Sequence, residues 1–309
     1  MKTRNATLIF CFMLMLGGAR THGQPRFTNW TEPTNLEAAV NSAFTDQHPA
    51  ISKDGLTLYF ISNRPGGTGG PDIYVSKREG IADLWGAPVN PGPNVNSPDF
   101  DNAPTLSRDG HLLFFGSNRP GGCGGFDIWA SYRRHTHDDF GWEPAFNLGC
   151  AINTPFDEDG PTYFENEEAG VTTLYFTSLN RPGNLGDWDI YTSTLQANGT
   201  FGAGQIVPEL CSTGRDTRTS ISRNGLEMYI TSNRAGGLGG LDLWLATRDA
   251  TTEAWSQPVN LSAPVNTAAN EGAPALSFDG ATLYFYSLRA GGYGGNDLYV
   301  TTRAKITGH

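Results

Sequence analysis

One segment of this 309-residue chain occurs five times, and this repetition constrains the fold more than any other feature. Each copy follows the order P-x-[LI]-S-x-[DN]-G, then [LM]-Y-F-x-S-N-R, then D-[IL]-[YW], with some variation. The aspartates of the last motif are separated by 55, 62, 53 and 55 residues, at Asp72, Asp127, Asp189, Asp242 and Asp297. Repetition of this kind indicates similar units that bury their apolar faces against their neighbours.

Each repeat divides into short β-strands joined by turns. In the first copy, an apolar run at residues 49–52 meets the turn Lys53-Asp54-Gly55, and an Asp-Gly pair is typical of a tight hairpin. The aromatic and β-branched run 56–62 and the segment 72–76 are the expected second and third strands. A weaker fourth strand begins at an aromatic residue and contains proline, which suits an outer edge. Four antiparallel strands with glycine-rich turns are the unit of a β-propeller.

The fifth copy ends at Arg303 without its fourth strand, and the missing pattern lies near the other end of the chain, at residues 30–36. We therefore predict an all-β, five-bladed β-propeller whose ring is closed by an N-terminal strand that joins the last blade. Closure removes exposed sheet edges, whereas the alternative, an open solenoid, would leave them. The predicted single domain covers residues 24–309, with blades at 48–90, 103–147, 160–206, 218–260, and 273–303 plus 30–36.

The first residues are not expected to belong to the propeller. Lys2 and Arg4 precede an apolar run at residues 6–16 and then small residues, which is the order of a secretory signal peptide. We predict that residues 1–23 are removed and that the mature protein is secreted or periplasmic. The run is short for a membrane span, so none is expected; an uncleaved amphipathic start is the alternative.

Charge and cysteine content limit the partners and the cross-links. A formal net charge of −10 argues against a nucleic-acid partner, and we expect a monomer. Cys123, Cys150 and Cys211 remain after the signal peptide. A Cys123–Cys150 bridge, a Cys150–Cys211 bridge and three reduced thiols are all compatible with the sequence.

The repeated motifs resemble the TolB-type, WD-repeat-like β-propellers of exported bacterial proteins. The resemblance covers nearly the whole mature chain. It implies a scaffold or binding platform in the periplasm or cell envelope. The same architecture also carries hydrolases and lyases that act on carbohydrates, so the fold alone does not decide the function.

Every blade has an acid three residues before its first proline position and an arginine in its glycine-rich loop, and both are expected on one face. The acids are Asp46, Asp101, Glu158, Asp216 and Glu271; the arginines are Arg64, Arg119, Arg181, Arg234 and Arg289. The acids predict either a ring of carboxylates around the channel mouth or a set of structural ion pairs with the arginines.

Positions that differ between blades are better candidates for a site, because active sites ordinarily break the symmetry. His48 and Arg218 stand one residue before the proline position, and Asp159 is a second acid beside Glu158. The predicted ligand-binding residues are His48, Asp159, Asp216, Arg218 and Glu271.

We favour a non-catalytic protein that binds a small molecule, an oligosaccharide or an envelope protein at the acidic channel mouth. The alternative is a carbohydrate-active hydrolase or lyase in which Asp46, Asp101 and Glu158 act as acid and base. That assignment follows the resemblance to five-bladed glycosidases, which divide the work among acids on successive blades. The same oxygens could hold Ca²⁺, and no other cofactor is predicted.

Overall fold

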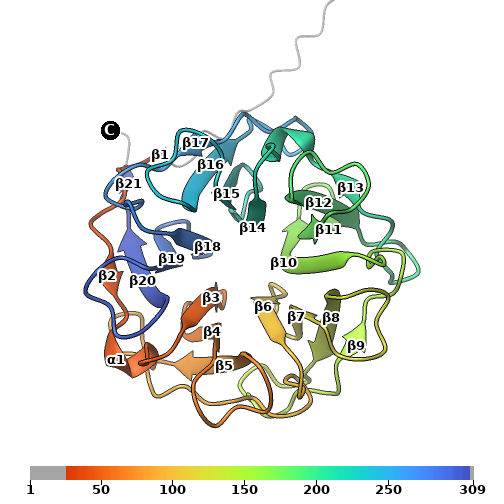
Figure 1. Ribbon diagram of the computed structural model, residues 1–309, viewed down its shortest axis with the longest axis horizontal. Coiled ribbons are helices and arrows are strands. Elements are labelled where there is room, and N and C mark those ends of the chain that lie inside the picture. The colour runs from red at the N-terminus through yellow and green to blue at the C-terminus, as the bar shows by residue number, and fades with distance from the viewer. Residues whose placement is uncertain (1–25, 307–309) are drawn as a thin grey trace, which may run out of the picture.

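The computed structural model describes residues 26–306, in which five antiparallel β-sheets stand around a central channel (Figure 1). The prediction of an all-β, five-bladed β-propeller is confirmed. The innermost strand of each blade faces the channel, and the other strands follow outward in chain order, except that the outer strand of the last blade comes from the N-terminal part of the chain. The predicted signal peptide, residues 1–23, lies outside the described residues.

The blades are built from strands with the following limits. Blade 1 contains β3 (Asp46–Ile51), β4 (Thr57–Ser62) and β5 (Asp72–Lys77). Blade 2 contains β6 (Asp101–Leu106), β7 (Leu112–Ser117), β8 (Asp127–Tyr132) and β9 (Phe146–Asn147). Blade 3 contains β10 (Asp157–Asn166), β11 (Val171–Leu179), β12 (Trp188–Thr194) and β13 (Gln205–Ile206). Blade 4 contains β14 (Asp216–Ile221), β15 (Glu227–Ser232), β16 (Asp242–Thr247) and β17 (Val259–Asn260). Blade 5 contains β18 (Glu271–Leu276), β19 (Thr282–Ser287), β20 (Asp297–Thr302) and β2 (Thr34–Asn35).

The ring is closed by the N-terminal strand, as predicted. In β2, Thr34 lies opposite Val300 and Asn35 lies opposite Tyr299 of β20. A second pair of strands, β1 (Arg26–Phe27) and β21 (Lys305–Ile306), adds to this closure and was not expected from the repeats. Two short helices, α1 (Glu37–Val40) and η1 (Pro208–Leu210), lie in connections between blades. None of the described helices is long and apolar enough to cross a membrane.

The core lies between the blades rather than within any one of them. Between blades 1 and 2, for example, Tyr59 and Ile61 pack with Leu113 and Phe115, and all four side chains are buried. Burying a large apolar side chain contributes about 1.5–3 kcal/mol. Each blade therefore depends on its neighbours, and a closed ring is the arrangement in which no blade has an uncovered face.

The aromatic residue that marks the fourth strand has a structural role in four of the five blades. An arginine from the end of the third strand stacks on its ring, with the guanidinium 4.1–4.6 Å from the ring centroid. The pairs are Arg78–Trp85, Arg133–Trp142, Arg248–Trp255 and Arg303–Trp30. In blade 1 the fourth strand itself is reduced to one bridge, between Val75 and Val89.

One of the alternatives for the cysteines is realised. Cys123 and Cys150 form a disulfide with their Cα atoms 5.6 Å apart, which joins the glycine-rich loop of blade 2 to the segment after β9. Cys211 is a buried free thiol whose sulfur accepts a hydrogen bond from the backbone N–H of Ile190 at 3.3 Å. Burial raises the pKa of this thiol, so it is not a reactive thiolate.

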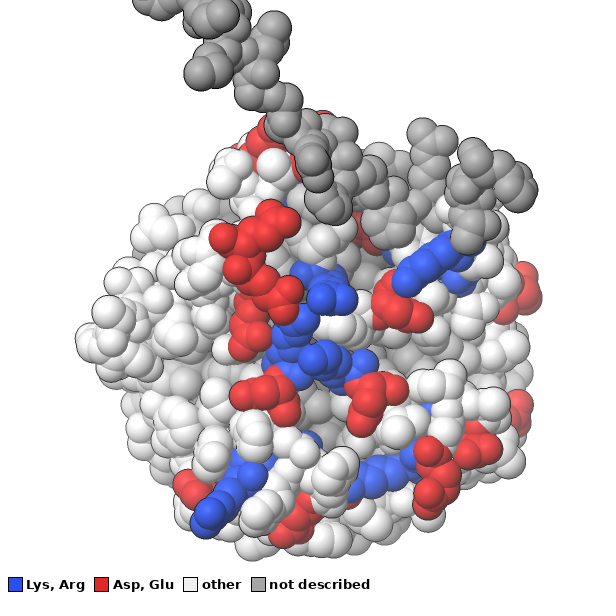
Figure 2. All heavy atoms as spheres, turned by 180° about the vertical axis from the view of Figure 1, so that it is seen from behind, with Lys and Arg blue, Asp and Glu red and all other residues white. Residues whose placement is uncertain are grey.

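The two faces of the ring differ in the connections that lie on them. We call the face with the glycine-rich loops the loop face, and the face with the hairpins after the innermost strands the hairpin face. Figure 2 shows the hairpin face. Basic side chains gather near its centre, and acidic side chains surround them.

Candidate functional site

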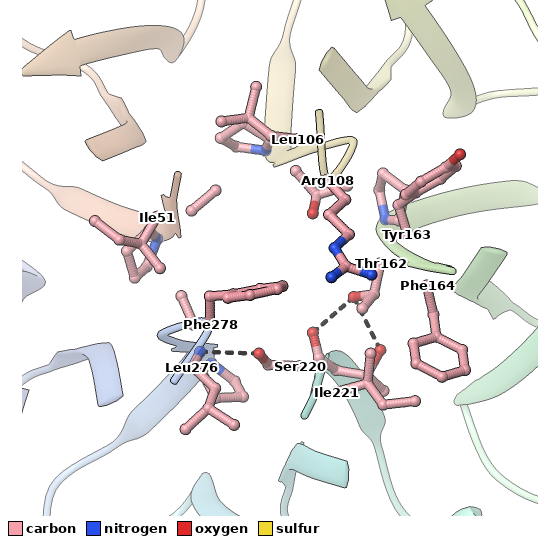
Figure 3. Close-up of a pocket in the computed structure, with 18 of the residues that line it drawn as sticks. Ile51, Leu106, Arg108, Thr162, Tyr163, Phe164, Ser220, Ile221, Leu276 and Phe278 are labelled. Atoms are coloured by element: carbon pink, nitrogen blue, oxygen red, sulfur yellow. Dashed lines mark hydrogen bonds between the residues drawn. The ribbon is translucent and has the colours of Figure 1, made fainter. Parts of the chain in front are cut away.

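The central channel contains a cavity of about 170 Å³ that is lined by the innermost strands of all five blades (Figure 3). One end is formed by residues just before the blade prolines, among them His48 and Arg218. The other end reaches the hairpin face, at Lys53, Arg108 and Phe278. The wall between these ends mixes aliphatic side chains with hydroxyl groups, as Figure 3 shows for Ile51, Leu106, Thr162, Ser220 and Leu276.

A bulge in every innermost strand explains why the residue before the proline reaches the channel. The pairing with the second strand shifts at this point in all five blades. The bulged residue has a positive φ, which is 55° at His48 and 47° at Arg218. Such a conformation is strained for residues other than glycine, and a bulge redirects the side chain. The corresponding residues in the other blades are Ala103, Gly160 and Ala273.

Five polar or aromatic side chains, one from each blade, meet across the channel and form what we call the channel network: His48, Asn102, Asp159, Arg218 and Tyr286. Asp159 Oδ2 accepts hydrogen bonds from Arg218 Nη2 at 3.0 Å and from Asn102 Nδ2 at 2.8 Å. His48 Nδ1 lies 2.6 Å from Asn102 Oδ1 and 3.2 Å from Arg218 Nη2. The Tyr286 ring lies edge-on to His48, with 5.9 Å between the centroids.

The hydrogen bonds of the network determine which nitrogen of His48 is free. Asn102 donates from its amide nitrogen to Asp159, so its Oδ1 must accept from His48 Nδ1. The proton of the neutral ring is therefore on Nδ1, and Nε2 carries the lone pair. Burial and the Arg218 guanidinium hold the pKa of His48 well below its usual value, so the ring is neutral at pH 7.

Three glycines make room for the network. A Cβ atom at Gly116 would overlap the Asp159 carboxylate, one at Gly160 would press on Arg218, and one at Gly272 would overlap the Tyr286 hydroxyl. In the second strands of the other blades, the position of Gly116 holds Ile61, Thr177, Thr231 or Tyr286. A glycine inside a strand commonly marks such a close approach, and this signal could have drawn attention to Asn102 and Tyr286, which we did not predict as site residues.

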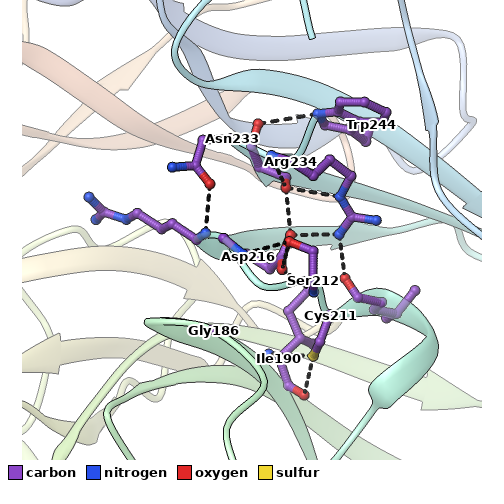
Figure 4. A network of polar contacts seen from close by, with 12 residues as sticks. Gly186, Ile190, Cys211, Ser212, Asp216, Asn233, Arg234 and Trp244 are labelled. Atoms are coloured by element: carbon purple, nitrogen blue, oxygen red, sulfur yellow. Dashed lines mark hydrogen bonds and ion pairs between the residues drawn. The ribbon is translucent and has the colours of Figure 1, made fainter. Parts of the chain in front are cut away.

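The predicted ring of acids forms the ion pairs that the sequence left as one of two alternatives. In blade 4, Arg234 Nη2 donates to Asp216 Oδ1 at 2.5 Å and to the carbonyl oxygen of Leu210 (Figure 4). The other Asp216 oxygen accepts from the backbone N–H and the hydroxyl of Ser212. All five acids are 0% exposed, and their partners are, in blade order, Arg64, Arg119, Arg181, Arg234 and Arg289.

The five pairs are not equally tight. The aspartates of blades 1, 2 and 4 lie 2.5 Å from their arginines. The glutamates lie farther away, at 4.0 Å for Glu158–Arg181 and 3.4 Å for Glu271–Arg289. In every case the acid also accepts a hydrogen bond from a serine or threonine hydroxyl four residues earlier, in the connection that leads into the blade.

The structure therefore separates the predicted site residues into two groups. His48, Asp159 and Arg218 come together in the channel network. Asp46, Asp101, Glu158, Asp216 and Glu271 stay inside the blades, where a saccharide in the channel would not touch their carboxylates. Among residues 26–306, no three His, Cys, Asp or Glu side chains are placed so that they could hold a metal ion such as the Ca²⁺ we considered.

Comparison with known proteins adds the fold relationship. No protein-family model and no curated protein sequence matches this chain. Among solved structures, the endo-arabinase from Bacteroides thetaiotaomicron VPI-5482 is 16% identical, with a TM-score of 0.60 over 91% of this chain and 98% of that chain. The α-L-arabinofuranosidase from Lactobacillus brevis is 15% identical, with a TM-score of 0.59 over 89% of this chain and 95% of that chain. A thermostable family-43 glycoside hydrolase is 10% identical, with a TM-score of 0.58 over 89% and 94% of the two chains.

These comparisons correct two predictions. The predicted TolB-type resemblance is supported only as far as the five-bladed β-propeller fold, which this chain shares with glycoside hydrolases. The non-catalytic binding or scaffolding role is wrong, because many of the similar structures are glycoside hydrolases and favour the alternative of a carbohydrate-active enzyme. Likeness at 10–16% identity shows the shared fold and does not by itself assign an activity to this chain.

Proposed function

We propose that this protein is a carbohydrate-active enzyme that cleaves a glycosidic bond in its central channel, after export to the periplasm or the cell exterior. The observation that carries the proposal is the channel network. Five repeats would place five similar side chains at the axis, but this chain places a different one from each blade there. Such loss of symmetry among hydrogen-bonded polar groups beside a cavity is typical of a catalytic site.

His48 is the group we propose for proton transfer. Its Nε2 has no hydrogen-bond partner among the described residues, and the ring borders the cavity. A neutral imidazole with a free nitrogen can accept a proton from water or from a saccharide. Asp159 and Asn102 are positioning residues, because they fix the tautomer of His48 through a chain of hydrogen bonds. Arg218 contributes a positive charge beside the same ring.

The test is to incubate the mature protein with arabinan, arabinoxylan and xylo-oligosaccharides and to measure newly formed reducing ends. These substrates follow the arabinan- and xylan-related names of the similar structures. We expect His48→Asn to lose about 10²–10⁴-fold in rate, the usual contribution of general acid–base catalysis. Asparagine can still donate to Asn102, so the melting temperature should change little.

The matched control is His111→Asn. His111 Nδ1 also makes a hydrogen bond, to the carbonyl oxygen of Arg133 at 2.8 Å, but His111 does not border the cavity. This variant should keep full activity. Turnover that survives His48→Asn would refute the role of His48 in proton transfer. Absence of turnover on every glycan tested would refute the proposal that this protein cleaves glycosidic bonds.

A further inference from the structure

Three cations gather around one aromatic ring where the cavity reaches the hairpin face. Lys53 Nζ lies 5.2 Å from the centroid of the Phe278 ring, and the guanidinium carbons of Arg108 and Arg223 lie 4.8 and 4.7 Å from it. All four residues line the cavity. Figure 3 shows Arg108 and Phe278 side by side at this end. We call Lys53, Arg108, Arg223 and Phe278 the cationic mouth.

The cationic mouth is built from one position of the repeat. In each of these four blades a serine directly follows the inner strand, and the next residue, before the Asp or Asn of the hairpin turn, belongs to the cationic mouth. Equivalent positions in a propeller are related by the rotation of the ring, so they converge on the channel axis. The residue at this position differs between blades, as in the channel network, whereas the serine before it is shared by these four blades.

The positive charge of the mouth is only partly neutralised by the protein. Glu167 forms ion pairs with Arg108 and, at 3.7 Å, with Arg223. Lys53 has no carboxylate partner within residues 26–306. The nearby hairpin acids Asp54, Asp109 and Asp279 accept hydrogen bonds from serines of their own turns, at 2.5–2.6 Å, and form no ion pair with these cations. Three cations thus share one acid.

The surroundings of the mouth select the kind of anion. Acidic side chains encircle the basic centre of this face (Figure 2), and the whole chain has a net charge of −10. An extended polyanion such as nucleic acid would be repelled by that rim. A single carboxylate that enters at the axis avoids it, and the planar guanidinium groups of Arg108 and Arg223 can bind a carboxylate through paired hydrogen bonds.

Glu167 already shows the interaction that a ligand would make. Its side chain is 60% exposed, so it can move away at little cost. A ligand carboxylate could replace it as the partner of Arg108 and Arg223 while the rest of the ligand occupies the cavity. We propose that the cationic mouth binds the carboxylate of a uronate-bearing saccharide. This inference rests on the proposed function, since it names the class of saccharide that the channel receives.

The test is calorimetric titration of the intact mature protein with trigalacturonate and with its fully methyl-esterified form, which lacks the negative charges. We expect the acid to bind at least about tenfold more tightly than the ester, because charge-assisted hydrogen bonds are lost in the ester. Arg108→Gln and Arg223→Gln should each remove most of this preference. Glu167→Gln should strengthen binding of the acid several-fold, because the competing carboxylate is gone.

Arg134→Gln is the matched control, since Arg134 is an exposed arginine that does not line the cavity, and it should bind like the unmodified protein. Arg223 is 55% exposed, so its variant is expected to fold even if Arg108→Gln does not.

Equal affinity for acid and ester would overturn this inference while leaving glycosidic cleavage of neutral glycans intact. Displacement of the acid by inorganic phosphate at equal concentration would also overturn it, by showing a general anion site. Binding of the acid in preference to the ester, without any turnover, would support carboxylate binding at the cationic mouth and count against the proposed cleavage of a glycosidic bond.

Discussion

In blades 1 to 4, the acid of the ion pair and the residue of the channel network are at most two residues apart in sequence, yet one is repeated in every blade and the other is not. Asp46 is followed two residues later by His48, and Asp216 by Arg218. The acids occur in every blade and have the same kind of partner each time, whereas the network uses a different residue in each blade. In blades 1 and 4 the bulge lets the acid point into the blade while the side chain two positions later reaches the axis. In this propeller the repeated ion pairs stabilise the blades, and the residues that differ between blades form the polar contacts of the channel.

The largest effect should come from breaking a tight ion pair. Arg119→Ala leaves the fully buried Asp101 without its counter-charge, and loss of one partner of a buried pair costs about 3–5 kcal/mol. Arg181→Ala should cost only about 1–2 kcal/mol, because Arg181 lies 4.0 Å from Glu158 and makes no hydrogen bond to it. The free energy of unfolding in urea measures both changes.

Arg134→Ala is the control for the loss of an exposed arginine and should change the free energy of unfolding by less than about 0.5 kcal/mol. Equal costs for Arg119→Ala and Arg181→Ala would mean that the distance between acid and arginine does not govern the strength of the pair. The repeated pairs would then be equivalent despite their geometry.

A methyl group at Gly116 should disturb the channel network with a smaller effect. Gly116→Ala forces the Asp159 carboxylate to move, and overpacking of this kind costs about 1–3 kcal/mol. The double variant Gly116→Ala with Asp159→Ala removes the obstacle, so the alanine at 116 should then cost little. Unfolding of the four forms of this cycle gives the coupling. A cost at Gly116 that persists without Asp159 would contradict the close approach.

The smallest effect concerns pH and distinguishes the network from the ion pairs. The pKa of His48 is lowered in the folded state, mainly by burial and then by Arg218, so below pH 6.5 the unfolded chain binds the proton more readily. Stability is therefore present above that pH and falls as the pH drops, by at most about 1.4 kcal/mol per unit from this residue. Urea unfolding at pH 7.5 and 5.5 should show a smaller fall for His48→Asn than for the unmodified protein. Identical falls would contradict a buried neutral His48.

The fold could be predicted because each of the five copies of one pattern contains the residues typical of the first three strands of a blade. The fourth strand absent after Arg303 and present at 30–36 was enough to predict the closure. The network was only partly predictable: His48, Arg218 and Asp159 differ from their equivalents, but the contacts of Asn102 and Tyr286 depend on the bulge and on Gly116 and Gly272. Hydrophobic patterns do not reveal a bulge, because they report which face a strand buries and not where its register shifts.

Sequence alone also could not choose between a carboxylate ring and ion pairs. Both require acids and arginines at the same repeated positions, and only the side-chain directions distinguish them. The same holds for Cys123, whose partner depended on which loops lie together in space. The cationic mouth is similar, since Lys53 and Arg223 lie far apart in sequence and meet only because the ring closes.

The pairing of β2 with β20, and of β1 with β21, has a consequence for the order in which the molecule can fold. Residues 26–35 pair with residues 299–306, so these two short strands have no partner until those later residues have been synthesised. Contacts of such long sequence separation form slowly. Blades 1 to 4 can assemble as the chain emerges, but the fifth keeps an open outer edge until the first-made strand arrives. The strands at residues 26–35 are thus made before all five blades and are the last part of the ring to be fixed.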